Sequence, residues 1–153
     1  EISCSVVLAA LTRGILVGIV TAVAIRFFIP FQVFDFAAIC FYGFMASFLL
    51  GALGLLCGIY ANSFDQMSAV TSYIITPLSF LSGTFYSVQN LPEFWYHFSQ
   101  YNPFFYMIDG IRYGLTGYHD GDLVFGAIYV IIWSLLSFSA CVYILHKGYR
   151  VKS

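Results

Sequence analysis

Side chains that could support metal, redox or nucleophilic chemistry are few in this chain. It contains four cysteines and three histidines, namely Cys4, Cys40, Cys57, Cys141, His97, His119 and His146. No two cysteines form a C-x-x-C pair and no histidine lies at ligand spacing, so the pattern indicates neither a metal centre nor a disulfide framework. We interpret the cysteines as free thiols that pack as small apolar side chains. No catalytic residue, metal site or cofactor is therefore predicted.

The sequence motifs of common enzymes are also missing. The chain has no G-x-x-x-x-G-K-[ST] phosphate loop, no G-x-S-x-G and no H-E-x-x-H. Its apolar stretches carry no paired acidic groups of the kind that relay protons. The chain is therefore not expected to be an enzyme, and it does not bind ATP through a phosphate loop.

Two charged residues are spaced so that they can pair. Asp109 and Arg112 are three residues apart, in a segment that we expect to be helical, so their side chains can meet on one face. The pair could act as a gate or contact a substrate. We favour a structural ion pair, because a charge close to lipid is costly and needs a partner.

The distribution of charged residues along the chain predicts the helices in which these residues lie. Only 8% of residues are charged, while 61% are hydrophobic and 20% are aromatic. About 20 apolar residues suffice for a helix to cross a bilayer. We predict an all-α polytopic membrane bundle with four spans, at about 6–28, 36–61, 67–87 and 123–145. Gly14-x-x-x-Gly18 and Gly54-x-x-x-Gly58 predict close helix packing.

The third predicted span is the most polar one. It contains many Ser and Thr residues and has Pro77 in its middle. Hydroxyl groups can satisfy backbone groups that a proline frees, bond to neighbouring helices, or line a path for a polar substrate. The sequence does not show whether these hydroxyl groups serve helix packing or line a substrate path.

The ends of the spans predict the orientation in the membrane. Lys147, Arg150 and Lys152 follow the last span, so the positive-inside rule places the C-terminus in the cytoplasm. The loop at 62–66 and the start of the chain are then cytoplasmic, and the loop at 29–35 is external. The net charge of −1 gives no reason to expect nucleic acid as a partner.

The external segment at 91–117 is too polar to cross the bilayer but is rich in aromatic residues. Pro92 followed by Glu93, and Asn102 followed by Pro103, are typical of helix starts. We expect two short helices, at about 92–101 and 103–114, that are re-entrant or interfacial. The alternative is an aromatic belt that only anchors the protein.

Several motifs follow one another in a recognisable order. They are FFIPFQV at 27–33, FDQMS at 64–68, ITPLSFLSGTFYS at 75–87, LPEFW at 91–95 and NPFFYMIDGIRYG at 102–114. In this order the chain resembles the permease subunits of bacterial ATP-binding-cassette exporters of the type-2 class. The likeness covers essentially all of residues 1–153, which look like spans three to six, the C-terminal part of a single six-span permease domain.

The resemblance implies a homodimeric permease in the bacterial inner membrane, surrounded by lipid and working with two separate ATPase subunits. It implies the ATP-driven export of a lipid, a glycan or a drug-like molecule, and no catalytic residue in the permease. It also implies that the two short external helices dip into the outer leaflet and shape the exit. Because a backbone break at membrane depth needs cover from protein or water, Tyr101, Asn102 and Phe105 are candidate exit-lining residues.

Two cytoplasmic segments are expected to contact the ATPase. They are residues 1–13 and the short loop of Asn62, Ser63, Phe64, Asp65 and Gln66. Two other classes of protein stay open. The first is a non-transport membrane scaffold or assembly subunit. The second is a membrane enzyme, which would need a nucleophile or a metal cluster outside this sequence.

Overall fold

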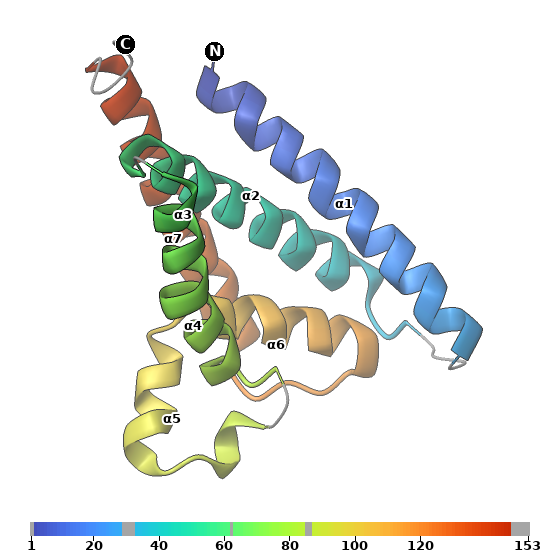
Figure 1. Ribbon diagram of the computed structural model, residues 1–153. Helices are drawn as coiled ribbons and strands as arrows, with labels where there is room; N and C mark the ends of the chain where they lie inside the picture. Colours follow the sequence, from blue (N-terminus) through green and yellow to red (C-terminus); the bar gives the residue numbers. More distant parts are fainter. Residues whose placement is uncertain (1, 29–32, 62, 85–86, 148–153) are drawn as a thin grey trace.

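The computed structural model describes residues 2–28, 33–61, 63–84 and 87–147, and this part of the chain contains helices but no strands (Figure 1). The elements are α1 (Ile2–Phe28), α2 (Phe36–Tyr60), α3 (Phe64–Val70), the π-helical turn η1 (Thr71–Ile75), α4 (Thr76–Leu81), the short 3₁₀ turn η2 (Val88–Asn90), α5 (Glu93–Gln100), α6 (Pro103–Thr116) and α7 (Leu123–His146). The expected all-α architecture is thus confirmed for the described residues.

Three helices in the described part of the chain are long and apolar enough to cross a membrane. They are residues Ser5–Phe28 of α1, all of α2 and all of α7. The predicted number of four spans is therefore not confirmed. In place of a third span at 67–87, the structure has a helical path from Phe64 to Leu81 that is divided into α3, η1 and α4. This path ends early because the chain turns at Gly83, whose φ is +75°.

Pro77 accounts for the division of this helix. A proline has no N–H, so the α-helical hydrogen bond that would reach the carbonyl of Tyr73 is missing. The backbone N–H of Thr76 instead reaches back five residues to the carbonyl of Thr71. The Thr76 hydroxyl donates to the same carbonyl at 3.0 Å. The result is a wide π turn just before the proline, at the level of Thr71–Ile75.

Polar side chains fix the starts of the other helices. Asp35 caps α2 by accepting hydrogen bonds from the N–H groups of Ala37 and Ala38, and Asp122 caps α7 through the N–H of Phe125 at 2.9 Å. The two expected short helices are present as α5 and α6, close to the predicted bounds. Helix α6 ends at Gly117, which has φ +76°.

Helix α2 is the centre of the packing. It lies against α1, α6 and α7, and α6 also packs on α7. The start of α1 and the end of α7 lie at the same end of the molecule, and α5 lies at the other end (Figure 1). The buried core forms where α2, α6, α7 and the η2 turn meet, and it consists of Leu49, Val88, Phe104, Phe105, Tyr106, Met107 and Val130.

Helices approach one another closely at some glycines, but most of these are not the glycines that the G-x-x-x-G pattern predicted. Gly110 of α6 lies against the ring of Tyr42, whose hydroxyl donates to the carbonyl of Leu123 at 2.7 Å. Of the two predicted glycine pairs, only Gly14 is in close contact, with Ser47, while Gly18, Gly54 and Gly58 face open space. The G-x-x-x-G spacing marks positions where a close approach is possible but does not reveal which ones are used.

Replacement of Gly110 by Ala should destabilise the fold. A Cβ atom there would collide with the Tyr42 ring, which is buried and held by its hydroxyl, so we expect a cost of about 1–3 kcal/mol from overpacking. Gly58→Ala is the matched control in a helix with open space around the new methyl, and it should gain roughly 0.5–1 kcal/mol. Thermal unfolding in detergent measures both. Equal effects of the two substitutions would contradict the close packing at Gly110.

Candidate functional site

The main partner of Arg112 is a residue that the sequence analysis missed. Its guanidinium Nη1 lies 2.8 Å from Oδ2 of Asp120, in the loop between α6 and α7, but 3.8 Å from Oδ1 of Asp109. The expected pair on one helix face is thus the longer of two contacts. Asp120 is eight residues from Arg112, so helical spacing could not have identified it.

Asp120 is the most heavily hydrogen-bonded carboxylate in the described part of the chain. Its oxygens accept from the Ser87 hydroxyl at 2.7 Å, the Tyr118 hydroxyl at 2.8 Å and the Val88 N–H at 3.2 Å, besides Arg112. Burial alone would raise the pKa of this carboxyl. The hydrogen bonds from Ser87, Tyr118 and Val88 and the positive charge of Arg112 outweigh burial and lower the pKa below its ordinary value.

Asp109 organises the same loop from α6. Its two oxygens accept from the backbone N–H groups of Asp120 at 2.8 Å and Gly121 at 2.9 Å, and its side chain is buried. Arg112 also donates through Nη2 to the carbonyl of Gly83, at the end of α4. We call Asp109, Arg112 and Asp120 the polar clamp. It joins the end of α4, the start of η2, helix α6 and the loop before α7.

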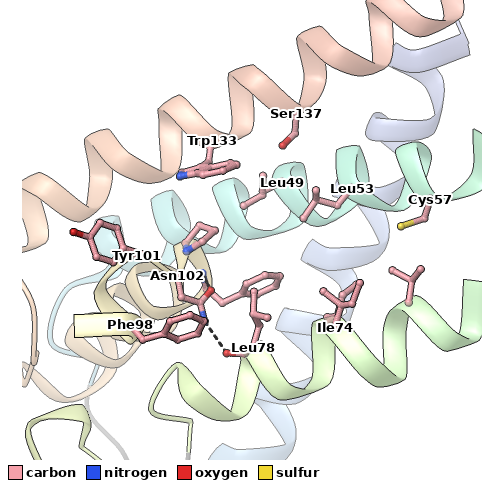
Figure 2. A pocket seen from close by; sticks show the side chains of 14 residues that line it. Leu49, Leu53, Cys57, Ile74, Leu78, Phe98, Tyr101, Asn102, Trp133 and Ser137 are labelled. Atoms are coloured by element: carbon pink, nitrogen blue, oxygen red, sulfur yellow. Dashed lines mark hydrogen bonds between the residues drawn. The ribbon is translucent and has the colours of Figure 1, made fainter. Parts of the chain in front are cut away.

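A second set of hydrogen bonds covers the break between α5 and α6. The Asn102 amide donates to the carbonyl of Leu78 at 2.8 Å (Figure 2). It also donates to the Ser82 hydroxyl at 2.9 Å, and its oxygen accepts from the N–H of Phe104. The Tyr129 hydroxyl donates to the carbonyl of Tyr101 at 2.7 Å. Side chains of the protein therefore satisfy the polar groups at this break.

An apolar cavity of about 380 Å³ lies between α2, the η1–α4 segment, the α5–α6 break and α7 (Figure 2). Its walls are mainly aliphatic and aromatic, and include Leu49, Leu53, Ile74, Leu78, Phe104 and Trp133. This volume is within the usual range of small-molecule sites, which is roughly 300–1,000 Å³. The arrangement can hold an apolar molecule between helices.

The three candidate exit-lining residues separate into two groups. Tyr101 and Asn102 border the cavity, with Tyr101 77% exposed and Asn102 buried. Phe105 is only 1% exposed and belongs to the core, so it faces no open path in this structure. The sequence marked the backbone break but could not reveal which face of α6 points inward.

The candidate ATPase-contacting loop lies at the junction of α2 and α3. Ser63 caps α3 by accepting from the N–H of Gln66 at 3.3 Å, and Phe64 and Asp65 are exposed. Asn62 is outside the described residues, as is Glu1. In the other candidate segment, Arg13 lies beside a groove between α1 and α2.

The described residues offer no place for a metal ion. No group of three His, Cys, Asp or Glu side chains comes together among them. Cys40, Cys57 and Cys141 are free thiols, and the buried Cys141 thiol donates to the carbonyl of Ala52 at 3.2 Å.

These features define the class as a multi-pass helical membrane protein with an apolar cavity between its spans. The ABC-2 type transporter model matches residues 1–116, and the chain belongs to that family. It is 41% identical over 133 residues to the inner membrane transport permease YadH of Escherichia coli strain K12, and equally to the protein of that name from Shigella flexneri. These matches cover 81% of this chain and 52% of each relative, so the chain spans about half the length of the curated relatives it matches. No solved structure matches the chain.

Asp120→Asn should destabilise the protein at neutral pH. The change leaves the Arg112 guanidinium without its closest charged partner, at an expected cost of about 1–3 kcal/mol. Asp65→Asn, at an exposed position, is the control and should change stability by less than about 0.5 kcal/mol. Thermal unfolding in detergent measures both. If the two substitutions have equal effects, the clamp does not stabilise the fold.

The difference in stability between wild type and Asp120→Asn should shrink in acid. Because folding lowers the pKa of Asp120, its contribution is fully present above the ordinary value of 3.8 and is lost as the pH falls through the lowered pKa. The stability difference between wild type and Asp120→Asn should therefore stay constant from pH 7 to about 5 and shrink only in stronger acid. A difference that disappears near neutral pH would contradict the lowered pKa.

Proposed function

We propose that residues 1–153 are the C-terminal part of a single transmembrane permease domain of an ATP-binding-cassette exporter in the bacterial inner membrane. The observation that carries this proposal is the apolar cavity between the spanning helices, in a chain of the ABC-2 type transporter family. The name of the E. coli relative, an inner membrane transport permease, supports the same location and role. Family membership does not favour a non-transport scaffold.

In this proposal the chain crosses the membrane four times. The helical path Phe64–Leu81 has 18 residues and a length of about 27 Å, close to the hydrocarbon thickness of about 30 Å. It starts beside the end of α2 and runs toward α5 (Figure 1). Helices α5 and α6 then form the re-entrant pair at the outer face, and α7 returns to the cytoplasm, where Lys147 follows its last turn.

The permease works as a homodimer with a separate ATPase on which ATP is hydrolysed. Large apolar side chains on α1 and α7 are exposed in the single chain, which leaves room for lipid and for a second copy. The loop of Ser63 to Gln66 and the start of α1 contact the ATPase, since short segments at helix ends transmit movement with little loss. The cargo is a lipid, a glycan or a drug-like molecule.

Filling the cavity should impair the exporter. The full-length protein and its ATPase are reconstituted in vesicles of inner-membrane lipid, and mass and ATP hydrolysis are measured. We expect a dimer whose rate of hydrolysis falls about tenfold with Ile74→Trp, because the larger indole takes up space in the cavity that a cargo molecule would occupy. Ile132→Trp is the matched control on α7: Ile74 is 53% exposed and Ile132 is 49% exposed, but Ile132 does not line the cavity. An isolated monomer that transports without nucleotide would disprove the proposal.

Cross-linking tests the contact with the ATPase and the orientation together. On a background free of native cysteines, Phe64→Cys should cross-link to the ATPase, because Phe64 is 81% exposed at the end of the molecule assigned to the cytoplasm. Phe28→Cys is the control at the far end of α1, where the side chain is 87% exposed. A cross-link from Phe28 but not from Phe64 would reverse the proposed orientation.

A further inference from the structure

The cavity is long in the direction of the helices. On the side formed by the end of α3, η1 and α4 its wall extends from Val70 to Leu78, which is eight residues or about 12 Å of helix rise. On the opposite wall it extends along α2 from Leu49 to Cys57. An elongated apolar space of this kind suits a hydrocarbon chain better than a compact polar molecule.

Polar groups in the cavity wall are few, and the amide of Asn102 already has partners. Both hydrogen-bonding ends of the Asn102 amide are engaged with the protein. A glycan would bring many hydroxyl groups into this space and leave them without partners, at a cost of about 1–3 kcal/mol for each group. The wall therefore disfavours a sugar in the cavity.

One deep hydroxyl group is different. Ser137 of α7 lines the cavity, is only 6% exposed and has no hydrogen-bond partner in the described part of the chain. Figure 2 shows its oxygen on the side of α7 that faces Leu49 and Leu53 of α2. Buried hydroxyl groups normally find a partner, so an acceptor on a bound molecule would complete this site.

The rim of the cavity is suited to the polar end of an amphiphile. Trp133 and Tyr101 are exposed at the end nearest the α5–α6 break, and each combines an aromatic body with a polar tip. Ser137 lies one turn deeper along α7 than Trp133, about 6 Å further from the rim. A lipid with its headgroup at the rim would place its linkage near Ser137 and its chain toward Cys57 and Val70.

The cavity also has a side through which a lipid could enter. The helical path Phe64–Leu81 packs against α2 and α6, and α7 is not among its main contacts. Ile74 and Trp133, on the two sides of this gap, are both exposed. A chain from the bilayer could pass between them without an aqueous step.

We infer that this cavity binds one hydrocarbon chain of an acyl lipid and that the Ser137 hydroxyl donates a hydrogen bond to the carbonyl of the lipid's ester or amide linkage. The inference rests on the proposed function, since a bound lipid is cargo only if the chain is a permease. It narrows the cargo from lipid, glycan or drug-like molecule to acyl lipid.

Photolabelling tests the inference without ATP hydrolysis. The full-length protein with its ATPase is placed in vesicles containing a trace of phospholipid with a diazirine in one ester-linked chain, and labelled residues are mapped by mass spectrometry. We expect label at Leu53 and Ile74 above that at Leu136, which is exposed on α7 outside the cavity. Ser137→Ala should lower the cavity label about two- to tenfold, the usual effect of one neutral hydrogen bond.

Two controls separate the hydrogen bond from general effects. The ether-linked probe lacks the carbonyl, so Ser137→Ala should not change its labelling. Ser139→Ala removes an exposed hydroxyl of α7 outside the cavity and should change neither probe. If Ser137→Ala lowers the folded yield, Ile74→Trp keeps the hydroxyl but narrows the space, and label at Leu53 must then fall.

Equal labelling of Leu136 and Ile74 would mean bulk lipid only and would overturn the inference. If Ser137→Ala lowers the labelling by the ester-linked and ether-linked probes equally, Ser137 makes no hydrogen bond to the carbonyl of the linkage. Specific labelling of the cavity in a complex that shows no ATP-dependent transport would uphold the binding site and reject the proposed function. ATP-dependent export with no label in the cavity would uphold the proposed function and reject the lipid-binding site.

Discussion

In hydrocarbon, every backbone N–H and C=O group needs a partner within the protein, and the rest of this structure depends on that constraint. Regular helices meet it without help, but this chain interrupts its helices at several points. Where Pro77 removes a donor, the Thr76 N–H and hydroxyl both bond to the Thr71 carbonyl. Where α5 ends, Asn102 and Tyr129 bond to the surrounding backbone. Each interruption is thus held by side chains within hydrogen-bonding reach.

The same hydrogen bonds make the cavity apolar, because they occupy polar groups at its wall. Asn102 borders the cavity, yet its amide bonds to Leu78, Ser82 and Phe104, so it offers a bound molecule no free polar atom. The polar clamp acts at a distance from the cavity, where it joins the end of α4 to α6 through Arg112 and Gly83. The walls formed by α4 and by the α5–α6 break are therefore held in one arrangement, and what remains open between them is apolar.

The parts of this fold that could be predicted are those that depend on neighbouring residues. Gaps between charges indicated the long helices, and Asn102 followed by Pro103 indicated the start of α6, because a cap acts within one helical turn. What depends on residues distant in the sequence was missed. Asp120 reaches Arg112 only because the loop folds back over α6, and Phe105 is buried because of the side that α6 presents to α2 and α7. The helical segment expected at 67–87 begins and ends earlier, at Phe64 and Leu81, since hydropathy does not register the turn at Gly83.

The π turn at Thr71–Ile75 changes how the faces of its helix are counted. In a regular α-helix each residue advances the side chains by about 100°, so positions four apart stay on one face. The π turn closes its hydrogen bond over five residues, and the angular phase beyond it is offset by about one residue. Leu78 lines the same cavity as Val70 although the turn lies between them, and Ile75 of the turn lines it as well. A helical wheel drawn through residues 64–81 as one regular α-helix would therefore assign the wrong faces beyond the π turn.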